Sequence, residues 1–584
     1  MSGDALESGI VEPGRSTWSR PLRGMLLFLA AFAMVVVMYR PTWNSLSSTL
    51  PWNLGDPALA TWVLSWEWHS VLNEPSRFFD GNIFHPYGEA LKYSDLILPA
   101  MPFFGLVLAL SQSAIVAHNA TILALSLFCV IATYLLARRL IEGPAVVVTA
   151  VAFSFSGFVF MHQSHLQLLT LGFFPLSFLM LLRVLDKRRT RDGVLLGLSS
   201  GSLALASFYY GAVWFVCLIV VVVVDAVRVR WPDREWWLAL GSAAGMTVLL
   251  VAPVAYVYAS FQARVPLIRE VGEFGLNPID ALTPAPGSVL YSNLFDWASV
   301  RQSGGSVEHG FFLGFIVLAL ALAGSVAWLV VTVRGFRRQS PSTRTHLEIG
   351  YVSLGGAVGL LLAVGPEVRG VSMPFALLDG LPGFSSIRAV SRFAVPGLLA
   401  ACVLGGWFLA RVLASAKPLL RSLVVVVVTG AVLLELAVVP IRAEVEEPGE
   451  IRNVLRQSLQ GAVVELPMLP GTGPPFVFVE GPRLLESIGD WRPRFNGFSG
   501  GFPPGYLADI TVLSEFPNES AMDRIQELGL RYVVLHGSRN GGAETYSFEE
   551  IVMSLMAVPN SASVTRSGNS WLIDLRPVTD DSPD

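Results

Sequence analysis

The stretch GDPALATWVLSWEWH, residues 55–69, directly follows the first long apolar run and its short polar tail, and it sets how the rest of the chain is interpreted. Asp is a favoured N-cap and Pro a favoured first helical residue, so Asp56-Pro57 predicts a helix over residues 57–72. The tryptophans of the stretch suit a membrane interface. A carboxylate fixed at a helix start also suits acid–base chemistry. Asp56 is therefore a candidate cap and a candidate catalytic residue of an outer loop.

The composition is that of a polytopic membrane protein. The 584 residues are 53% hydrophobic and 14% charged, whereas soluble domains carry about 25% charged residues. The net charge of −4 indicates no nucleic-acid partner. All cysteines lie inside apolar runs, so we expect no disulfides in the soluble parts. Residues 1–21 are interpreted as a disordered cytoplasmic tail and not as a signal peptide, because the apolar run that follows is long enough to span.

Hydropathy predicts an α-helical membrane domain over residues 22–440. Spanning helices need about 17 to 25 mostly apolar residues, and the sequence contains about 11 such runs. They are 22–39, 115–137, 144–160, 166–183, 193–208, 211–227, 236–258, 310–333, 347–365, 392–414 and 419–440. One further run, 96–110, is shorter and contains two prolines.

Basic residues decide the orientation. If 96–110 crossed the membrane, the clusters at 138–139 and 183–191 would lie outside, against the positive-inside rule. If it is re-entrant or interfacial, every basic cluster lies inside and the N-terminus is cytoplasmic. The outer elements are then the loop 40–114, the turn 161–165, the loops 260–309 and 366–391, and an extracytoplasmic domain over 441–584.

The region 441–584 has the pattern of a small α/β domain. Segments 461–466, 531–535 and 570–575 are predicted strands, because they are apolar and rich in β-branched residues. Residues 520–528 predict a helix with Ser520 as its N-cap, and the chain turns at Gly529.

The outer elements carry several candidate substrate-binding residues. His162 and His165 have the spacing of half a metal site. They are interpreted either as a polar turn between two spans or as hydrogen-bonding groups that share a cavity with Asp56. Asp80 and His85 lie in a loop that is more polar than a spacer requires.

Three further candidates lie at the outer ends of later spans. Glu308 is costly there unless it is paired or hydrated. Arg388 and Arg392 suit bidentate phosphate recognition, and the alternative is that they reach lipid headgroups from the interface. The sequence contains no Walker motif, dinucleotide glycine fingerprint, zinc-hydrolase motif or nucleophile elbow.

Four stretches together resemble a known superfamily. They are residues 55–57 (GDP), 79–86 (FDGNIFHP), 381–388 (LPGFSSIR) and the region from 482–484 (PRL) to 496–500 (NGFSG). With the span–loop–span order, this pattern resembles the GT-C integral-membrane glycosyltransferases, near the YfhO-like and mannosyltransferase-like bacterial branches.

The resemblance implies hexosyl transfer at a bacterial plasma membrane. A polyprenyl-phosphate sugar donor in the membrane lipid would react with a cell-envelope glycan, lipid or protein acceptor on the outer face. Asp56 would be the general base or a metal ligand, and Arg388 or Arg392 would lie near the donor phosphate. Many members have two adjacent acidic residues, but here Pro57 follows Asp56. The second carboxylate is missing or comes from Asp80, so dependence on Mg²⁺ or Mn²⁺ stays open.

Two other functions remain open. A transporter or flippase of lipid-linked saccharides would place charges near the bilayer midplane. The predicted spans are nearly free of charge, with Glu435 as the clearest exception near an outer end. A non-catalytic envelope scaffold is the third interpretation.

Overall fold

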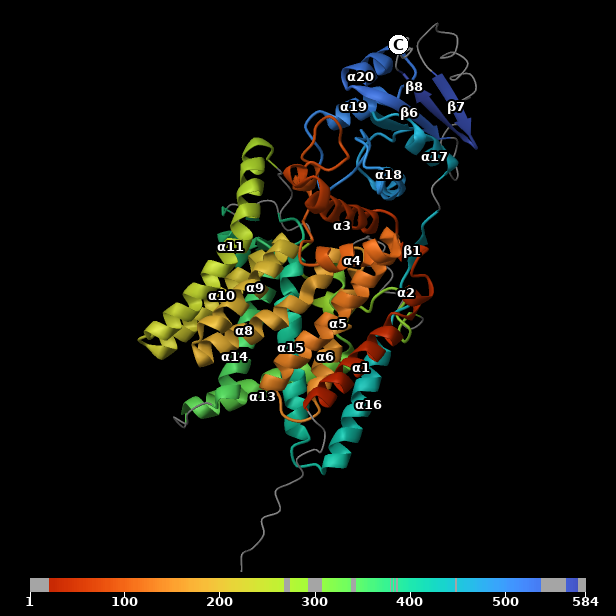
Figure 1. The fold of residues 1–584 in the computed structure, drawn as a ribbon. Helices are drawn as coiled ribbons and strands as arrows, with labels where there is room; N and C mark the ends of the chain where they lie inside the picture. Colours follow the sequence, from red (N-terminus) through yellow and green to blue (C-terminus); the bar gives the residue numbers. More distant parts are fainter. Residues whose placement is uncertain are drawn as a thin grey trace, which may run out of the picture.

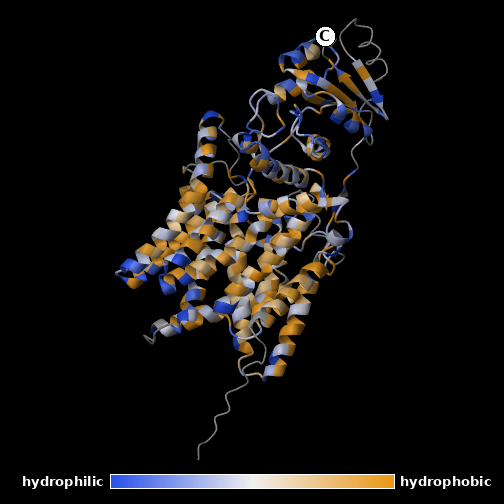
Figure 2. Ribbon diagram, viewed as in Figure 1, coloured by the Kyte–Doolittle hydropathy of each residue, from blue (hydrophilic) through white to orange (hydrophobic). Residues whose placement is uncertain are grey.

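The computed structural model describes residues 20–266, 274–292, 307–337, 343–378, 380–381, 383–384, 387–446, 449–536 and 563–575. A helical bundle carries a small sheet region at one end (Figure 1). The bundle is mostly apolar along its length, and hydrophilic residues gather at its ends and on the sheet region (Figure 2). We call the end of the bundle that carries the sheet region the site face, and the other end the opposite face.

Eight helical segments within the described residues are long and apolar enough to cross a membrane. They are α5 (Ala114–Leu140), η3–α8 (Leu166–Gly172, Phe173–Lys187), α10 (Phe208–Val229), α11 (Arg234–Arg264), α13 (Phe315–Arg337), α14 (Arg344–Ala363), η8–α15 (Val390–Ala394, Val395–Val412) and α16 (Pro418–Leu436). The chain is thus a multi-pass membrane protein. Each is one of the predicted spans.

The other predicted spans are also helical, but their continuous apolar helical stretches do not meet the length and hydropathy of a full span. They are α1 (Arg20–Met38), α6–α7 (Val146–Ser154, Gly157–Met161) and α9 (Thr190–Ala206). The run 96–110 forms only α4 (Met101–Ser111), whose 11 residues rise about 16 Å, too short to cross a bilayer. This agrees with the interfacial interpretation of that run. The connecting elements are α2 (Arg40–Asn44), η1 (Pro75–Arg77), η2 (Ala90–Tyr93), η4 (Pro278–Leu282), η5 (Val307–His309), β2 (Glu367–Val368), β3 (Val371–Ser372) and η6 (Pro374–Leu377).

Glu435, the charged exception among the predicted spans, caps the N-terminus of α13. Its carboxylate accepts hydrogen bonds from the backbone N–H of Phe315 at 2.6 Å and of Ile316 at 3.1 Å, and from the Tyr291 hydroxyl at 2.6 Å. These amides belong to the first turn of α13, where the backbone N–H groups have no acceptor inside the helix. The charge at this position therefore has a structural explanation and does not mark a transport path.

The C-terminal region contains a four-stranded sheet in the order β5 (Ala462–Leu466), β6 (Leu530–His536), β8 (Ser570–Asp574) and β7 (Ser563–Ser567). β5 and β6 are parallel and the other pairs antiparallel. The helices are α17 (Glu450–Gln457), α18 (Pro474–Ser487), α19 (Tyr506–Leu513) and α20 (Glu519–Glu527). The three predicted strands and the predicted helix are present. The predicted cap Ser520 is wrong: the Asn518 side chain accepts from Ala521 N at 2.8 Å, two residues earlier.

The first loop joins the bundle to the sheet region. β1 (Thr49–Pro51) pairs antiparallel with β4 (Arg442–Glu444). Further along the loop, Arg494 N donates to Asn82 O at 2.7 Å, and His85 N donates to Arg494 O at 2.8 Å. α3 (Asp56–Asn73) lies beneath α18, with the end of α18 toward the viewer (Figure 1). The start of α3 is therefore held between the bundle and the C-terminal region.

Candidate active site

Asp56 is the first residue of α3, and its carboxylate does not cap the helix. Gly55 occupies the cap position, and no side-chain cap bond is present. The predicted N-cap role of Asp56 is wrong, since the helix begins at Asp56 itself, one residue earlier than that role requires. The side chain of Asp56 is 53% exposed, and its Oδ2 lies 3.3 Å from Nε2 of His165. The carboxylate is therefore accessible at the site face and lies beside a neighbouring imidazole.

His165 lies at the end of the turn between α7 and η3. Its Nδ1 is 2.9 Å from the Ser164 hydroxyl. Burial lowers the pKa of His165 to about 4, against the opposing effect of the Asp56 charge. The imidazole is therefore neutral at pH 7. With the Ser164 hydroxyl donating to Nδ1, the ring carries its proton on Nε2, the nitrogen that faces Asp56, a tautomer assigned from the contact with Ser164.

His162 is the inner member of the same turn. Its side chain is fully buried, and Nδ1 lies 2.9 Å from the carbonyl oxygen of Phe158. The ring stacks on that of Phe158 with centroids 4.0 Å apart, and its centroid lies 5.9 Å from that of His165. Nε2 faces Glu308 Oε2 at 3.4 Å. His162 therefore anchors the turn and does not reach solvent.

A buried ion pair between Glu308 and Arg392 contacts His162. Arg392 donates to both carboxylate oxygens of Glu308, from Nε at 2.9 Å and from a terminal nitrogen at 2.5 Å. Burial opposes ionisation of Glu308, but the Arg392 charge holds the pKa of this carboxyl well below its usual range. The guanidinium also lies 4.5 Å from the centroid of the Tyr209 ring. The predicted contact of Arg392 and Glu308 with substrate stays a prediction; the structure shows the two residues paired with each other, with His162 beside Glu308 and Tyr209 beside Arg392.

The structure thus connects Asp56, His165, His162, Glu308 and Arg392 in one chain of contacts. Asp80 and His85 are elsewhere in the first loop. Asp80 Oδ2 is 3.6 Å from Arg77 Nε, and the backbone of His85 is bonded to Arg494. Within the described residues neither Asp80 nor His85 contacts Asp56 or His165, so their predicted substrate roles stay predictions.

Arg388 lies just before η8 and is exposed. Its guanidinium is 5.1 Å from the centroid of the Phe274 ring. Residues 382, 385 and 386 of the LPGFSSIR stretch lie outside the described residues. Arg388 is four residues from Arg392, so it is the accessible cation of this segment.

Gln163 lies between the two histidines of the turn. Its side chain is fully buried, and neither its amide oxygen nor its amide nitrogen has a hydrogen-bond partner among the described residues. An unpaired buried amide costs about 1–3 kcal/mol, so a bound group that satisfied it would be stabilised. The polar turn in the sequence was the signal for it, but the sequence alone did not separate Gln163 from its neighbours.

The candidate active site offers few ligands for a metal ion. Asp56 and His165 offer one carboxylate oxygen and one imidazole nitrogen, while Glu308 is engaged by Arg392. In the part of the chain that the structure describes, no group of three or more His, Cys, Asp or Glu could hold a metal ion. Mg²⁺ requires a near-octahedral set of oxygen ligands. These side chains alone do not fit Mg²⁺ or Mn²⁺, so we derive no step through a metal.

Comparison with known proteins shows similarity in fold only. No protein-family model and no curated sequence matches the chain. A mutant of the arabinofuranosyltransferase AftD from Mycobacteria aligns at 15% identity with a TM-score of 0.56, over 96% of this chain and 42% of AftD. This chain therefore spans less than half the length of AftD.

Two further solved structures align less closely. The oligosaccharyltransferase AglB from Archaeoglobus fulgidus has 14% identity and a TM-score of 0.44, over 89% of this chain and 70% of AglB. ArnT from Cupriavidus metallidurans has 12% identity and a TM-score of 0.42, over 95% and 98%. The AftD alignment shows that this chain shares the fold of the part of AftD that it covers.

Proposed function

We propose that this protein is a membrane glycosyltransferase. It transfers a sugar from a polyprenyl-phosphate donor to a hydroxyl group of a cell-envelope acceptor at the site face. One observation carries the proposal: the half-exposed carboxylate of Asp56 faces neutral His165 at the head of α3, in a fold shared with the aligned part of AftD. A scaffold would not need an accessible carboxylate in this position.

The proposed reaction exchanges one C–O bond for another. The acceptor oxygen attacks the anomeric carbon of the donor, and the bond from that carbon to the phosphate oxygen breaks. The proton of the acceptor hydroxyl passes to Asp56, and polyprenyl phosphate leaves with its negative charge. His165 orients the carboxylate through its Nε2 proton, and Arg388 stabilises the leaving phosphate.

The polar turn supports this chemistry by being rigid. The Glu308–Arg392 pair and the Phe158 carbonyl hold His162, and His162 precedes His165 by three residues in the same turn. Proton transfer requires a base held within hydrogen-bond reach of its substrate, and small displacements are costly. Gln163 supplies the amide that a sugar hydroxyl could satisfy.

We place the site face outside the cytoplasm. The last turns of α5 and α8 and the start of α9 carry basic residues, and these ends lie at the opposite face. Cytoplasmic loops of membrane proteins are enriched in Lys and Arg. The lipid-linked donor then reaches Asp56 from the outer leaflet.

Asp56→Asn tests the base. The variant keeps the shape of the side chain, and we expect transfer from a radiolabelled polyprenyl-phosphate sugar to fall about 10²–10⁴-fold, as for loss of a general base. Asp80→Asn is the matched control, because Asp80 is also exposed in the first loop but pairs with Arg77. Wild-type transfer by Asp56→Asn would refute the assignment. An equal fall in Asp80→Asn would show that the loop supplies the second carboxylate.

Arg388→Ala tests recognition of the phosphate. We expect a higher KM for the lipid-linked donor, by at least about tenfold, since one charge-assisted contact is worth about 1.5–3 kcal/mol. Arg189→Ala, an exposed arginine at the opposite face, is the control. An unchanged KM in Arg388→Ala would remove Arg388 from the donor site.

A further inference from the structure

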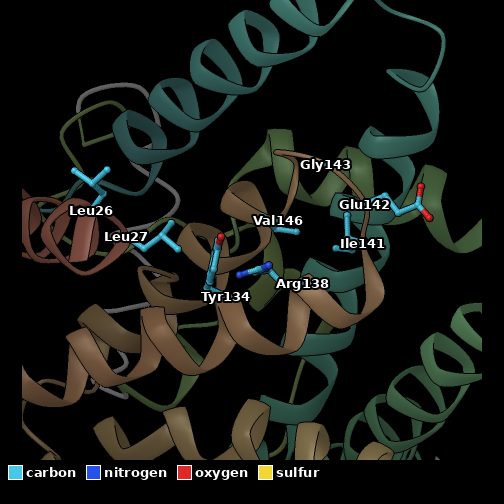
Figure 3. A pocket seen from close by; sticks show the side chains of 8 residues that line it. All are labelled: Leu26, Leu27, Tyr134, Arg138, Ile141, Glu142, Gly143 and Val146. Carbon is cyan, nitrogen blue, oxygen red and sulfur yellow. The ribbon is translucent and has the colours of Figure 1, made fainter. Parts of the chain in front are cut away.

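An open cavity of about 630 Å³ lies at the opposite face, between the first turns of α1, the last turns of α5 and the start of α6 (Figure 3). Small-molecule sites commonly measure about 300–1,000 Å³. The 27 residues of α5 rise about 40 Å, and its first turns lie at the site face. The cavity is therefore remote from Asp56 and shares no residue with the proposed transfer site.

The walls of the cavity are apolar. Leu26 and Leu27 of α1 line it with side chains that are 42% and 39% exposed, and Ile141 and Val146 close its base with buried side chains. At the end of a membrane-spanning bundle, exposed leucines next to an open cavity provide a surface for the upper part of an acyl chain.

The rim carries one charge of each sign. Arg138 and Glu142 both line the cavity and are both exposed. The Arg138 guanidinium lies beside the Tyr134 ring, 5.8 Å from its centroid. Figure 3 shows the Glu142 carboxylate on the other side of Ile141, away from Arg138. α5 ends at Leu140, so the two side chains do not lie on one helical face as an i,i+4 pair would.

Neither charge is neutralised by a described residue. Across the described ranges, Arg138 and Glu142 form no ion pair and no side-chain hydrogen bond. The adjacent Arg139 differs, because it binds Glu348 and Asp186. Arg421, near the cavity at Gly143, donates to three backbone carbonyls. Arg138 and Glu142 are thus two opposite charges that line the same cavity without forming an ion pair with each other.

We infer that this cavity binds the headgroup of a zwitterionic aminophospholipid. The lipid phosphate pairs with Arg138, and its primary ammonium donates hydrogen bonds to Glu142. The acyl chains run along Leu26 and Leu27 of α1. A purely anionic headgroup would satisfy Arg138 but would be repelled by Glu142, whereas the zwitterion complements both charges.

Lipid titration of the purified full-length protein tests the inference. Binding of phosphatidylethanolamine, phosphatidylglycerol and phosphatidylcholine is measured by native mass spectrometry in detergent. We expect phosphatidylethanolamine to bind the wild type most tightly, and Arg138→Gln to weaken phosphatidylethanolamine and phosphatidylglycerol by about three- to fivefold, as for a partly exposed ion pair. Glu142→Gln should weaken phosphatidylethanolamine by a similar factor and strengthen phosphatidylglycerol.

Arg334→Gln is the matched control. Arg334 is exposed in the last turns of α13 and does not line the cavity, so its removal should change none of the three affinities. Two results would overturn the inference. One is an unchanged order of lipids in Glu142→Gln; the other is a loss in Arg334→Gln as large as in Arg138→Gln, which indicates annular lipid only. All variants alter exposed side chains, and unchanged thermal unfolding confirms that they fold.

Discussion

The Glu308–Arg392 pair is expected to determine both the stability and the geometry of the site turn. Glu308 is 6% and Arg392 7% exposed, and they share two hydrogen bonds. Replacing either partner alone leaves an uncompensated buried charge. We therefore expect Glu308→Leu and Arg392→Met each to lower the free energy of unfolding by about 3–5 kcal/mol.

The double variant should recover most of this loss. Apolar replacement of a whole buried pair is often neutral or stabilising. One cost remains, because His162 Nε2 loses Glu308 Oε2 at 3.4 Å, and a buried unsatisfied group costs about 1–3 kcal/mol. Each single variant should lose at least about 3 kcal/mol of unfolding free energy, whereas the double variant should lose at most about 3 kcal/mol. The sum of the single losses therefore exceeds the double loss by a coupling energy of at least about 3 kcal/mol.

A double-mutant cycle measures this coupling. Unfolding of the purified protein in mixed micelles is followed by tryptophan fluorescence for the wild type, both single variants and the double variant. The exposed pair Arg77–Glu74 supplies the control cycle; its side chains are 52% and 34% exposed, and exposed pairs couple weakly. If the losses of Glu308→Leu and Arg392→Met simply add, the pair does not hold the turn. Sugar transfer should fall even in the stable double variant, because His162 is released.

Three further predictions follow from neighbouring residues. The unfolding free energy should decrease as the pH falls from about 6.5 to about 4. The reason is that the unfolded chain protonates His165 at its ordinary pKa, while in the folded chain burial lowers this pKa to about 4. His165→Gln should therefore reduce the dependence of the unfolding free energy on pH, as measured by unfolding curves at several pH values. Gly481→Ala should reduce transfer at least about tenfold, because its Cβ would lie 1.6 Å from Leu54 O and displace the start of α3, whereas Gly430→Ala, with no atom within 4 Å, should not. Transfer in EDTA and in added Mg²⁺ or Mn²⁺ should agree within about twofold, since Asp56 and His165 alone do not complete a metal site; a larger change would show that substrate supplies the missing ligands.

The helices of this fold follow from the sequence because lipid leaves the backbone few alternatives. Within a bilayer each N–H and C=O must be satisfied internally, so long apolar runs become helices. The position of breaks depends on distant packing. α6 and α7 separate near Gly157, whose N–H donates to Phe312 O at 2.7 Å, and a Cβ at Gly157 would lie 2.9 Å from that oxygen. No local pattern in the run 144–160 predicts a contact with residue 312.

The residues of the candidate site were predictable, and so was one of its contacts: a shared location of the histidine turn and Asp56 was one of the two interpretations of that turn, and His165 lies 3.3 Å from Asp56. His-x-x-His in a polar turn and an acid after the first span marked Asp56, His162 and His165 as candidates. The pairing of Glu308 with Arg392 joins residues 84 positions apart, and a single sequence holds no signal for that pairing. The cap role of Asp56 failed for a smaller reason, because one residue of shift at a helix start depends on backbone angles that propensity does not resolve.

The start of α3 depends on two parts of the molecule at once. From the bundle, His165 faces Asp56 at 3.3 Å. From the C-terminal region, Gly481 of α18 approaches so closely that any side chain would collide with Leu54 O, and Gly55 leaves room for Val477. A region that only captured acceptor could be joined by a mobile linker, whereas this one packs against the residues that precede the carboxylate. The C-terminal region therefore helps to position Asp56, because its helix α18 packs against the two residues that precede this carboxylate.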